Sequence, residues 1–412
     1  MKFNKIYIAL GMVLTLTSCK SDEPVPVEKT EPYMSFTISL SEEGTRADDN
    51  DRDPFGHDWD EDGDDEGIAF DCKIDNVTPV LYSAPGGTIV ADVPVGQITD
   101  VTKVDNGDGT ATFTGALKTD LNIDQLRAGN FRLAVFVNAT GRDICGSGIN
   151  IKNPSATTFH HHGKAGDKCP QGQPFNSIPM YGVAKVDFSG INPADHTTAD
   201  KSYTLKGESG QKLVIPVLRS MAKIRVTVDK NNHFNEKSEV NPDWLGAKRS
   251  VRLKEFTISR HNTLGYVVPR SWDKITSVTA LSTTTAQYVV GGSVGGQVWS
   301  EEHCTVTPGD FKEGNSTSML QVYLPETFND RNDPIVLTVK YYIDGNENNG
   351  DELTHTFYIA SRYNDINSTQ YDIFRNTIYQ FDIVGVENNT GELSLNVSVK
   401  PWISHDTEKI YY

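Results

Sequence analysis

Apolar and polar residues alternate along many short segments of this chain, and alternation with a period of two predicts β-strands. The first clear example is residues 33–40, where Met34, Phe36, Ile38 and Leu40 alternate with small hydroxyl-bearing residues. This pattern predicts a strand with one buried face and one polar face. No long segment has a convincing helical period.

Further strands are predicted in both halves of the chain. Asp105–Gly109 joins two of them as a hairpin turn, and the apolar run 131–138 is typical of a central strand packed on both faces. The remaining predicted strands are 76–82, 101–104, 111–113, 220–228, 251–259, 321–324, 335–343, 353–360, 379–384 and 393–399. Many short strands at this spacing predict an all-β protein built from β-sandwiches. We place the boundary between two such domains near residue 213.

The N-terminus has the features of a bacterial lipoprotein signal peptide over residues 1–18. Two early lysines precede an apolar run at 6–16, and Leu16-Thr17-Ser18-Cys19 fits a lipobox. The apolar run is too short to span a bilayer. Cys19 is therefore the predicted lipidation site, and we expect an exported precursor that its lipid anchors in the outer membrane.

Acidic residues dominate the charge of the 412-residue chain, with 55 Asp and Glu against 38 Lys and Arg and a formal net charge of −17. This balance argues against a nucleic-acid partner and against electrostatic binding to anionic lipid. Eleven of the carboxylates lie in residues 48–66 beside a single arginine. So dense a block of like charge predicts a solvated linker over residues 47–67.

Four aspartates of this linker, Asp58, Asp60, Asp62 and Asp64, match the first half of a calcium-binding loop. The match ends at position twelve, where Ala69 stands in place of the required bidentate glutamate. We therefore predict no metal and no cofactor, with calcium at these aspartates as the alternative.

Two other patterns are weak candidates for chemistry. His160-His161-His162 with Asp167 and Cys169 has zinc-ligand types, but consecutive histidines do not easily face one tetrahedral centre, so a surface loop is predicted. Gly291–Gly295 fits a hydrolase nucleophile elbow, but a strand at 296–299 follows where a helix is required. A hairpin turn explains the second pattern better. The sequence does not predict an enzyme.

Besides Cys19, four cysteines remain: Cys72, Cys145, Cys169 and Cys304. In an oxidising compartment they allow three full disulfide pairings, which the sequence does not distinguish. Buried thiols are the alternative.

Several fragments together resemble one known family. They are Thr45-Arg46-Ala47, 133–139, Ile178-Pro179-Met180-Tyr181-Gly182, 218–224, Tyr323-Leu324-Pro325-Glu326, 375–379 and 397–402. With the lipobox and the strand 33–40, their order over nearly the whole chain resembles the Bacteroidales fimbrillins, the type V pilus subunits. The resemblance implies two tandem β-sandwich domains of transthyretin-like or Greek-key topology and export as a lipoprotein. It also implies assembly into a surface fimbria after a trypsin-like protease cuts behind an arginine.

The physics of a removable strand supports that scheme. A strand that leaves a sheet exposes unpaired backbone groups and an apolar groove, which another chain can fill. Met34–Leu40 is the candidate removable strand, within a propeptide that spans residues 19–46. The candidate cut lies between Arg46 and Ala47, beside an acidic run that keeps the bond exposed. The alternative is that Arg46 is an ordinary linker arginine and the strand stays.

In the family the donor strand comes from the C-terminal segment, which makes Ile403, Ile410 and Tyr412 candidate donor residues here. The same segment also fits the last strand of the second domain. We expect domains at 68–213 and 214–412, and a structural or accessory fimbrial subunit that polymerises by donor-strand exchange and supports adhesion. Its partners are other fimbrial subunits and a processing protease, and the sequence identifies no surface ligand. A fimbrial tip adhesin, or a monomeric surface lipoprotein that binds glycan or protein, is the alternative.

Overall fold

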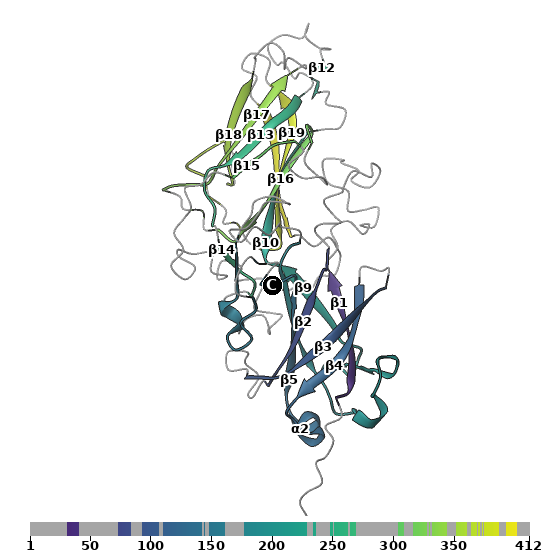
Figure 1. Cartoon of the computed structure of the whole chain (residues 1–412). Coiled ribbons are helices and arrows are strands. Elements are labelled where there is room, and N and C mark those ends of the chain that lie inside the picture. Colours follow the sequence, from purple (N-terminus) through teal and green to yellow (C-terminus); the bar gives the residue numbers. More distant parts are fainter. Residues whose placement is uncertain are drawn as a thin grey trace, which may run out of the picture. The chain divides into compact units, whose positions relative to one another are not determined.

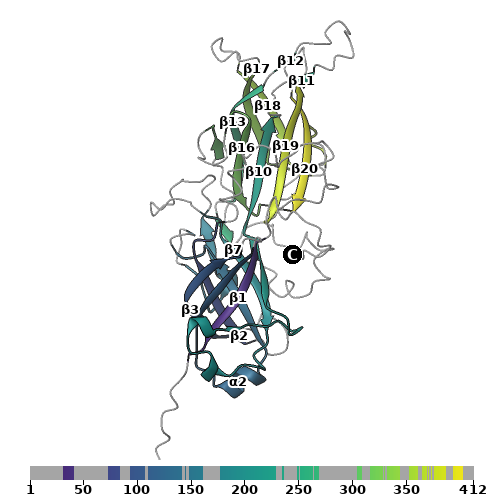
Figure 2. The same ribbon diagram turned by 90° about the vertical axis from the view of Figure 1, so that its right-hand side faces the viewer.

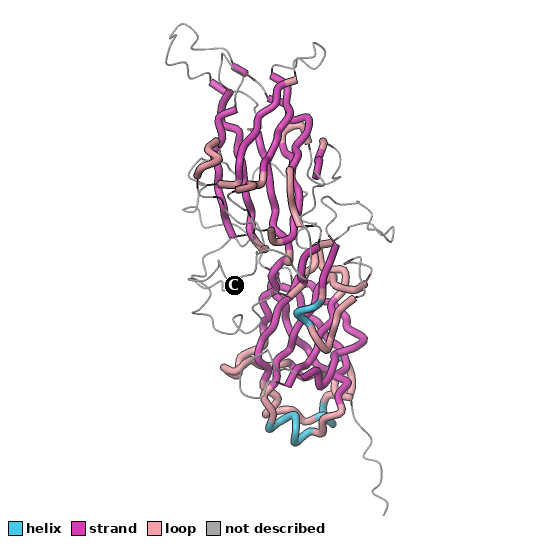
Figure 3. Tube along the Cα trace, turned by 90° about the vertical axis from the view of Figure 1, so that its left-hand side faces the viewer, coloured by secondary structure: helices cyan, strands magenta, loops and turns pink. Residues whose placement is uncertain are grey.

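The computed structural model of the chain describes the residues listed next, and all structural statements below refer to them. They are 31–40, 73–83, 93–106, 110–141, 144, 148–160, 177–228, 234–235, 248–249, 251–262, 264–268, 304–308, 316–327, 329, 332–343, 352–360, 364–368, 370, 373, 375–386 and 393–401. Strands dominate this part of the chain (Figure 3), which confirms the all-β prediction. The α-helix here is the six-residue α2 (Ile123–Ala128), which Asn122 and Gln125 begin with a reciprocal capping box.

The first sheet is closed rather than open. Its strands are β1 (Tyr33–Leu40), β2 (Val77–Ser83), β3 (Val93–Asp105), β4 (Thr110–Thr119), β5 (Phe131–Val137), β7 (Met180–Val186), β8 (Tyr203–Thr204) and β9 (Val214–Arg219). The order β4-β3-β2-β5-β7-β9-β1 returns to β4 because β1 pairs with both β9 and β4, and β8 branches from β1. These strands lie together in Figures 1 and 2, with β1 in purple. This barrel-like sheet differs from the predicted sandwich because β1 joins the two edges that a sandwich would leave open.

The core of the closed sheet comes from the inward residues of all its longer strands. Every residue of β5 is buried, as the apolar run predicted. β1 and β4 instead alternate apolar with hydroxyl-bearing residues, and only their apolar faces contribute to the hydrophobic core. The fold therefore follows the hydrophobic pattern strand by strand.

The chain changes sheets at Ser220. β9 pairs with β7 on one side and with β1 on the other, so it belongs to the first sheet. β10 (Met221–Val228) follows directly and pairs with strands of the second region. The predicted domain boundary near 213 therefore lies one strand before the change of sheet, because β9 and β10 are nearly continuous in sequence.

The second region contains two four-stranded sheets. One has the order β16-β10-β19-β20 and the other β15-β13-β17-β18. Their bounds, besides β10, are β13 (Val251–Ile258), β15 (Cys304–Val306), β16 (Met319–Pro325), β17 (Val336–Ile343), β18 (Leu353–Tyr358), β19 (Thr377–Val386) and β20 (Leu393–Pro401). Inward residues of both sheets form one hydrophobic cluster. Figure 2 shows the sheet that contains β10 and β19 face on.

Small elements complete the fold. They are the two-stranded pairs β6 (Thr158–His160) with β14 (Leu264–Tyr266) and β11 (Phe234–Asn235) with β12 (Lys248–Arg249), and the 3₁₀ turns η2 (Pro154–Ala156), η3 (Pro193–Asp195) and η4 (Ala199–Lys201). Among the described residues no helix is long and apolar enough to cross a membrane.

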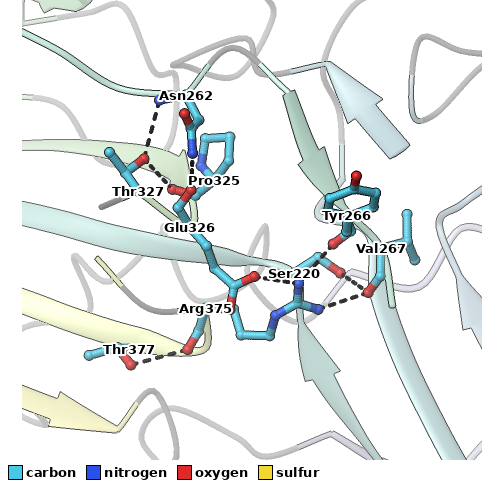
Figure 4. Close-up of polar contacts among 9 residues, drawn as sticks. All are labelled: Ser220, Asn262, Tyr266, Val267, Pro325, Glu326, Thr327, Arg375 and Thr377. Carbon is cyan, nitrogen blue, oxygen red and sulfur yellow. Dashed lines mark hydrogen bonds and ion pairs between the residues drawn. The ribbon is translucent and has the colours of Figure 1, made fainter. Parts of the chain in front are cut away.

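A buried ion pair lies beside β14 (Figure 4). The Arg375 guanidinium donates to the Glu326 carboxylate at 2.6 Å and to the carbonyls of Tyr266 and Val267 at 3.0 and 2.9 Å. The Ser220 hydroxyl also donates to the Val267 carbonyl, at 2.8 Å. The network thus joins the end of β14 to the residues that precede β10 and β19.

Candidate functional site

The strand predicted over residues 33–40 is β1, which contains the candidate removable segment Met34–Leu40, and it occupies a slot between two other strands. On one side it pairs antiparallel with β4, from Tyr33 opposite Ala116 to Ser39 opposite Thr110. On the other side it runs parallel to β9, with Thr37 beside Val214. The backbone of β1 is therefore hydrogen-bonded along both edges, and β1 is the strand that closes the sheet.

One face of β1 is part of the hydrophobic core. Met34, Phe36 and Ile38 are all 0% exposed. The Phe36 ring stacks on that of Phe113, with 5.7 Å between centroids and 21° between planes. Burying three large apolar side chains stabilises the occupied slot by about 1.5–3 kcal/mol each. These are the residues that the sequence predicted for this face, and Leu40 follows them at the end of the strand.

The opposite face of β1 is polar but also buried. Ser35 is 7% exposed and Thr37 is 2% exposed. The Ser35 hydroxyl donates to the Thr204 hydroxyl at 3.3 Å, and the hydroxyls of Thr37 and Thr112 are also 3.3 Å apart. The alternation predicted a polar face, but it gave no signal that this face is covered.

The N-terminal end of β1 is held by the loop between β7 and β8 and by the residue that follows β8. The Tyr33 amide donates to the His196 carbonyl at 2.8 Å, and the Leu205 amide donates to the Ser35 carbonyl at 2.8 Å. The His196 ring contacts the Tyr203 ring edge-on at 5.2 Å. Burial, with a smaller contribution from the Asp187 carboxylate, raises the pKa of Tyr203 above its usual value. The phenol is therefore neutral at physiological pH, and Tyr203 places no negative charge at this end of the slot.

β9, which borders the slot on one side, packs closely against β7. A Cβ atom on Gly182 of β7 would lie 2.5 Å from the Pro216 carbonyl oxygen and 2.8 Å from a Val217 methyl of β9. We expect Gly182→Ala to lower the free energy of unfolding by about 1–3 kcal/mol, because backbone would have to move. Chemical denaturation measures this. Gly207→Ala is the matched control, since its Cβ would lie 3.7 Å from the nearest atom. Equal effects of the two changes would contradict the close packing.

The other predicted site residues lie outside the described residues. They are Cys19, Arg46, Ala47, the linker aspartates Asp58, Asp60, Asp62 and Asp64, and the donor candidates Ile403, Ile410 and Tyr412. The segment Gly291–Gly295 also lies outside the described residues, as do Cys72, Cys145 and Cys169. Cys304 is described, partly buried in β15. No disulfide pairing is therefore tested.

His160 alone of the predicted histidine cluster is described. It lies in β6, opposite Leu264 of β14, and its amide donates to the Ile144 carbonyl at 3.0 Å. Among the described residues, no three His, Cys, Asp or Glu side chains are placed to hold a metal ion.

Comparison with known proteins gave structural neighbours but no sequence relatives. No protein-family model and no curated protein matches the chain. The tip fimbrial protein Mfa3 from Porphyromonas gingivalis, with a C-terminal truncation, is 12% identical; the match covers 90% of this chain and 99% of that one, with a TM-score of 0.43. A protein from Parabacteroides distasonis named as a putative cell adhesion protein is 14% identical; the match covers 91% of this chain and 99% of that one, with a TM-score of 0.45. A fimbrial assembly protein from the same species is 10% identical, with 88% and 98% covered and a TM-score of 0.38.

These neighbours are fimbrial and cell adhesion proteins of the Bacteroidales, the group to which the sequence motifs pointed. At 10% to 14% identity and TM-scores below 0.5, the likeness assigns no role to any residue of this chain.

Proposed function

We propose that this chain is a subunit of a cell-surface fimbria that polymerises by donor-strand exchange. In this proposal a protease cuts between Arg46 and Ala47, the strand 33–40 leaves with the propeptide, and a strand of another subunit takes its place. The protein is then structural rather than enzymatic.

The placement of β1 is the observation that carries the proposal. β1 is the first strand of the described residues, it is paired on both edges, and residues 41–46 directly follow it in the sequence. Its loss would leave unpaired edges on β4 and β9 and an apolar groove where Met34, Phe36 and Ile38 lay. Such a groove favours filling by another strand over remaining open to water. Cleavage and polymerisation are thereby linked.

The lipid on Cys19 is temporary in this proposal. It carries the precursor to the outer membrane, and the cut behind Arg46 separates both lipid and β1 from the rest of the chain. The mature subunit then has no lipid of its own, and the contacts between subunits hold it in the fimbria.

A second function remains open because β1 is so well paired. A strand with both edges hydrogen-bonded and its apolar face in the core equally suits a permanent part of the fold. The chain would then be a monomeric surface lipoprotein that binds glycan or protein. The two functions differ in whether β1 leaves.

A trypsin pulse on the purified protein tests the proposal. Arg46 and Arg52 are the trypsin sites between β1 and Lys73. The Arg52→Ala variant keeps only Arg46 in this stretch, and the Arg46→Ala/Arg52→Ala variant keeps neither. We expect the first variant to form a ladder of oligomers on a gel after the pulse, with mature chains that begin at Ala47.

The double variant is the matched control, and it should stay monomeric under the same pulse. An Arg52→Ala chain that is cut behind Arg46 yet remains monomeric, with the β1 peptide still bound, would support the permanent strand instead. N-terminal sequencing of the bands distinguishes this outcome from a failure of cleavage.

A further inference from the structure

We infer that the slot of β1 selects its occupant on both faces: it accepts strands that alternate apolar residues with side chains of serine or threonine size, in the direction of β1. The inference rests on the proposed exchange and adds the chemistry of the partner strand. Apolar alternation alone would not satisfy this slot, because the second face is closed as well.

Burial of the second face is the first step. The outward side chains of a half-buried strand normally reach water, and large or charged residues are then tolerated. In β1 the outward residues Ser35 and Thr37 are instead 7% and 2% exposed. A lysine or glutamate at these positions would lose its hydration, which is costly.

A row of hydroxyl groups lines this face of the slot. On β4 the residues opposite Ser35, Thr37 and Ser39 are Thr114, Thr112 and Thr110. On the other side Ser35 lies beside Thr204 of β8 and donates to its hydroxyl. A hydroxyl on the incoming strand would meet hydroxyl partners at the same positions, whereas an isosteric methyl would forgo these hydrogen bonds.

The Asn106 side chain holds part of this row in place. Its amide nitrogen donates to the hydroxyls of Thr110 at 2.8 Å and Thr112 at 3.1 Å. Thr112 thus bonds to Asn106 as well as facing Thr37, and a larger residue at position 37 would have to displace it. Size is thus restricted at the position of Thr37 as well as polarity.

Backbone hydrogen bonds set the direction of the occupant. The Thr37 amide donates to the Leu213 carbonyl at 3.1 Å, and the Ser35 carbonyl accepts from Leu205 at 2.8 Å. These bonds belong to a strand parallel to β8 and β9 and antiparallel to β4. A reversed strand would need a different register on both sides at once.

Selection on both faces of the slot affects the candidate donor segment, residues 403–412. Every window of five residues in it contains Asp406, Glu408 or Lys409. Any placement of this segment over positions 34–38 would therefore bury a charge on one face or the other. We expect a peptide of residues 403–412 to bind the vacated slot poorly.

Peptide competition tests the inference on the whole protein. The Arg52→Ala chain is cut behind Arg46, and a labelled synthetic peptide of residues 31–41 is added in excess during the pulse. Trypsin is then quenched, because Lys409 makes 403–412 a trypsin substrate, and unlabelled peptides compete: the native sequence, Thr37→Ser, Thr37→Val, Thr37→Leu, Phe36→Ser, and the sequence 403–412. Retention of the label on the protein is measured by size-exclusion chromatography.

The native and Thr37→Ser peptides should compete equally within about threefold. We expect Thr37→Val to be about threefold to tenfold weaker, from the lost hydroxyl pair. Thr37→Leu should be roughly tenfold to a hundredfold weaker, from overpacking. Phe36→Ser and the sequence 403–412 should not compete.

Two results separate the inference from the proposed function. If the native peptide binds and Thr37→Leu or 403–412 competes as well as it does, the slot does not select on its second face and the inference is wrong, while exchange stands. If the cut protein takes up no peptide at all, exchange fails and the inference fails with it.

Discussion

Replacing Phe36 by alanine is expected to lower the free energy of unfolding by about 3–5 kcal/mol, because the change leaves a cavity in the core of the closed sheet. The Phe36 side chain is 0% exposed and stacks on Phe113 of the neighbouring strand. Urea denaturation followed by circular dichroism measures the loss, with calorimetry to assign it to one transition.

Ser39→Ala is the matched control on the same strand, since Ser39 is only partly buried and lies near the end of β1. Its effect should stay within about 0.5 kcal/mol. A loss below about 1 kcal/mol for Phe36→Ala would contradict the placement of β1 in the core.

Replacing Arg375 by alanine is the second change with a large expected effect, a loss of about 3–5 kcal/mol. Arg375 is 4% exposed, and its removal takes the guanidinium donor away from the Glu326 carboxylate and from the carbonyls of Tyr266 and Val267, of which Val267 keeps the Ser220 hydroxyl. An uncompensated buried carboxylate is the main cost. Calorimetry of the purified variant measures this change.

An exposed ion pair gives the comparison. Lys185 and Glu208 are 2.6 Å apart, but their side chains are 45% and 68% exposed. Lys185→Ala should therefore change stability by no more than about 1 kcal/mol. If Arg375→Ala were no more damaging than Lys185→Ala, the network of Figure 4 would not be holding the fold together.

The sequence predicted where the strands lie better than it predicted which strands pair with one another. Residues 33–40 are recognisable as a strand because apolar side chains at every second position lie on one face of a strand. The same pattern does not indicate which strands pair with this one. Here β1 pairs with β9, which is far away in sequence and runs parallel to it. Closure of the sheet depends on that long-range contact, so a sandwich was the simpler prediction.

Buried polar residues were the other feature that the sequence did not reveal. Ser35 and Thr37 look like solvent-facing residues by type, and only their neighbours show that they are covered. Asn138 gave no signal either. It adopts a left-handed backbone conformation with φ of 51°, and its side chain bonds to the backbone of Asp75 and Ile178. Such roles depend on tertiary contacts.

Cleavage behind Arg46 is a prediction from sequence alone, and donor-strand exchange depends on it. The strand that it would release is now defined: it closes a sheet, it fills a groove on two faces, and it is the first described strand of the chain. Cleavage behind Arg46 would convert that closed sheet into an acceptor for a partner strand.

The most direct test is mass spectrometry of the subunit recovered from sheared surface material of the source cells. Donor-strand exchange predicts a mature chain that begins at Ala47, in oligomers that contain no peptide of residues 31–46. A chain that begins at a lipid-modified Cys19 in every preparation, with β1 still attached, would contradict it.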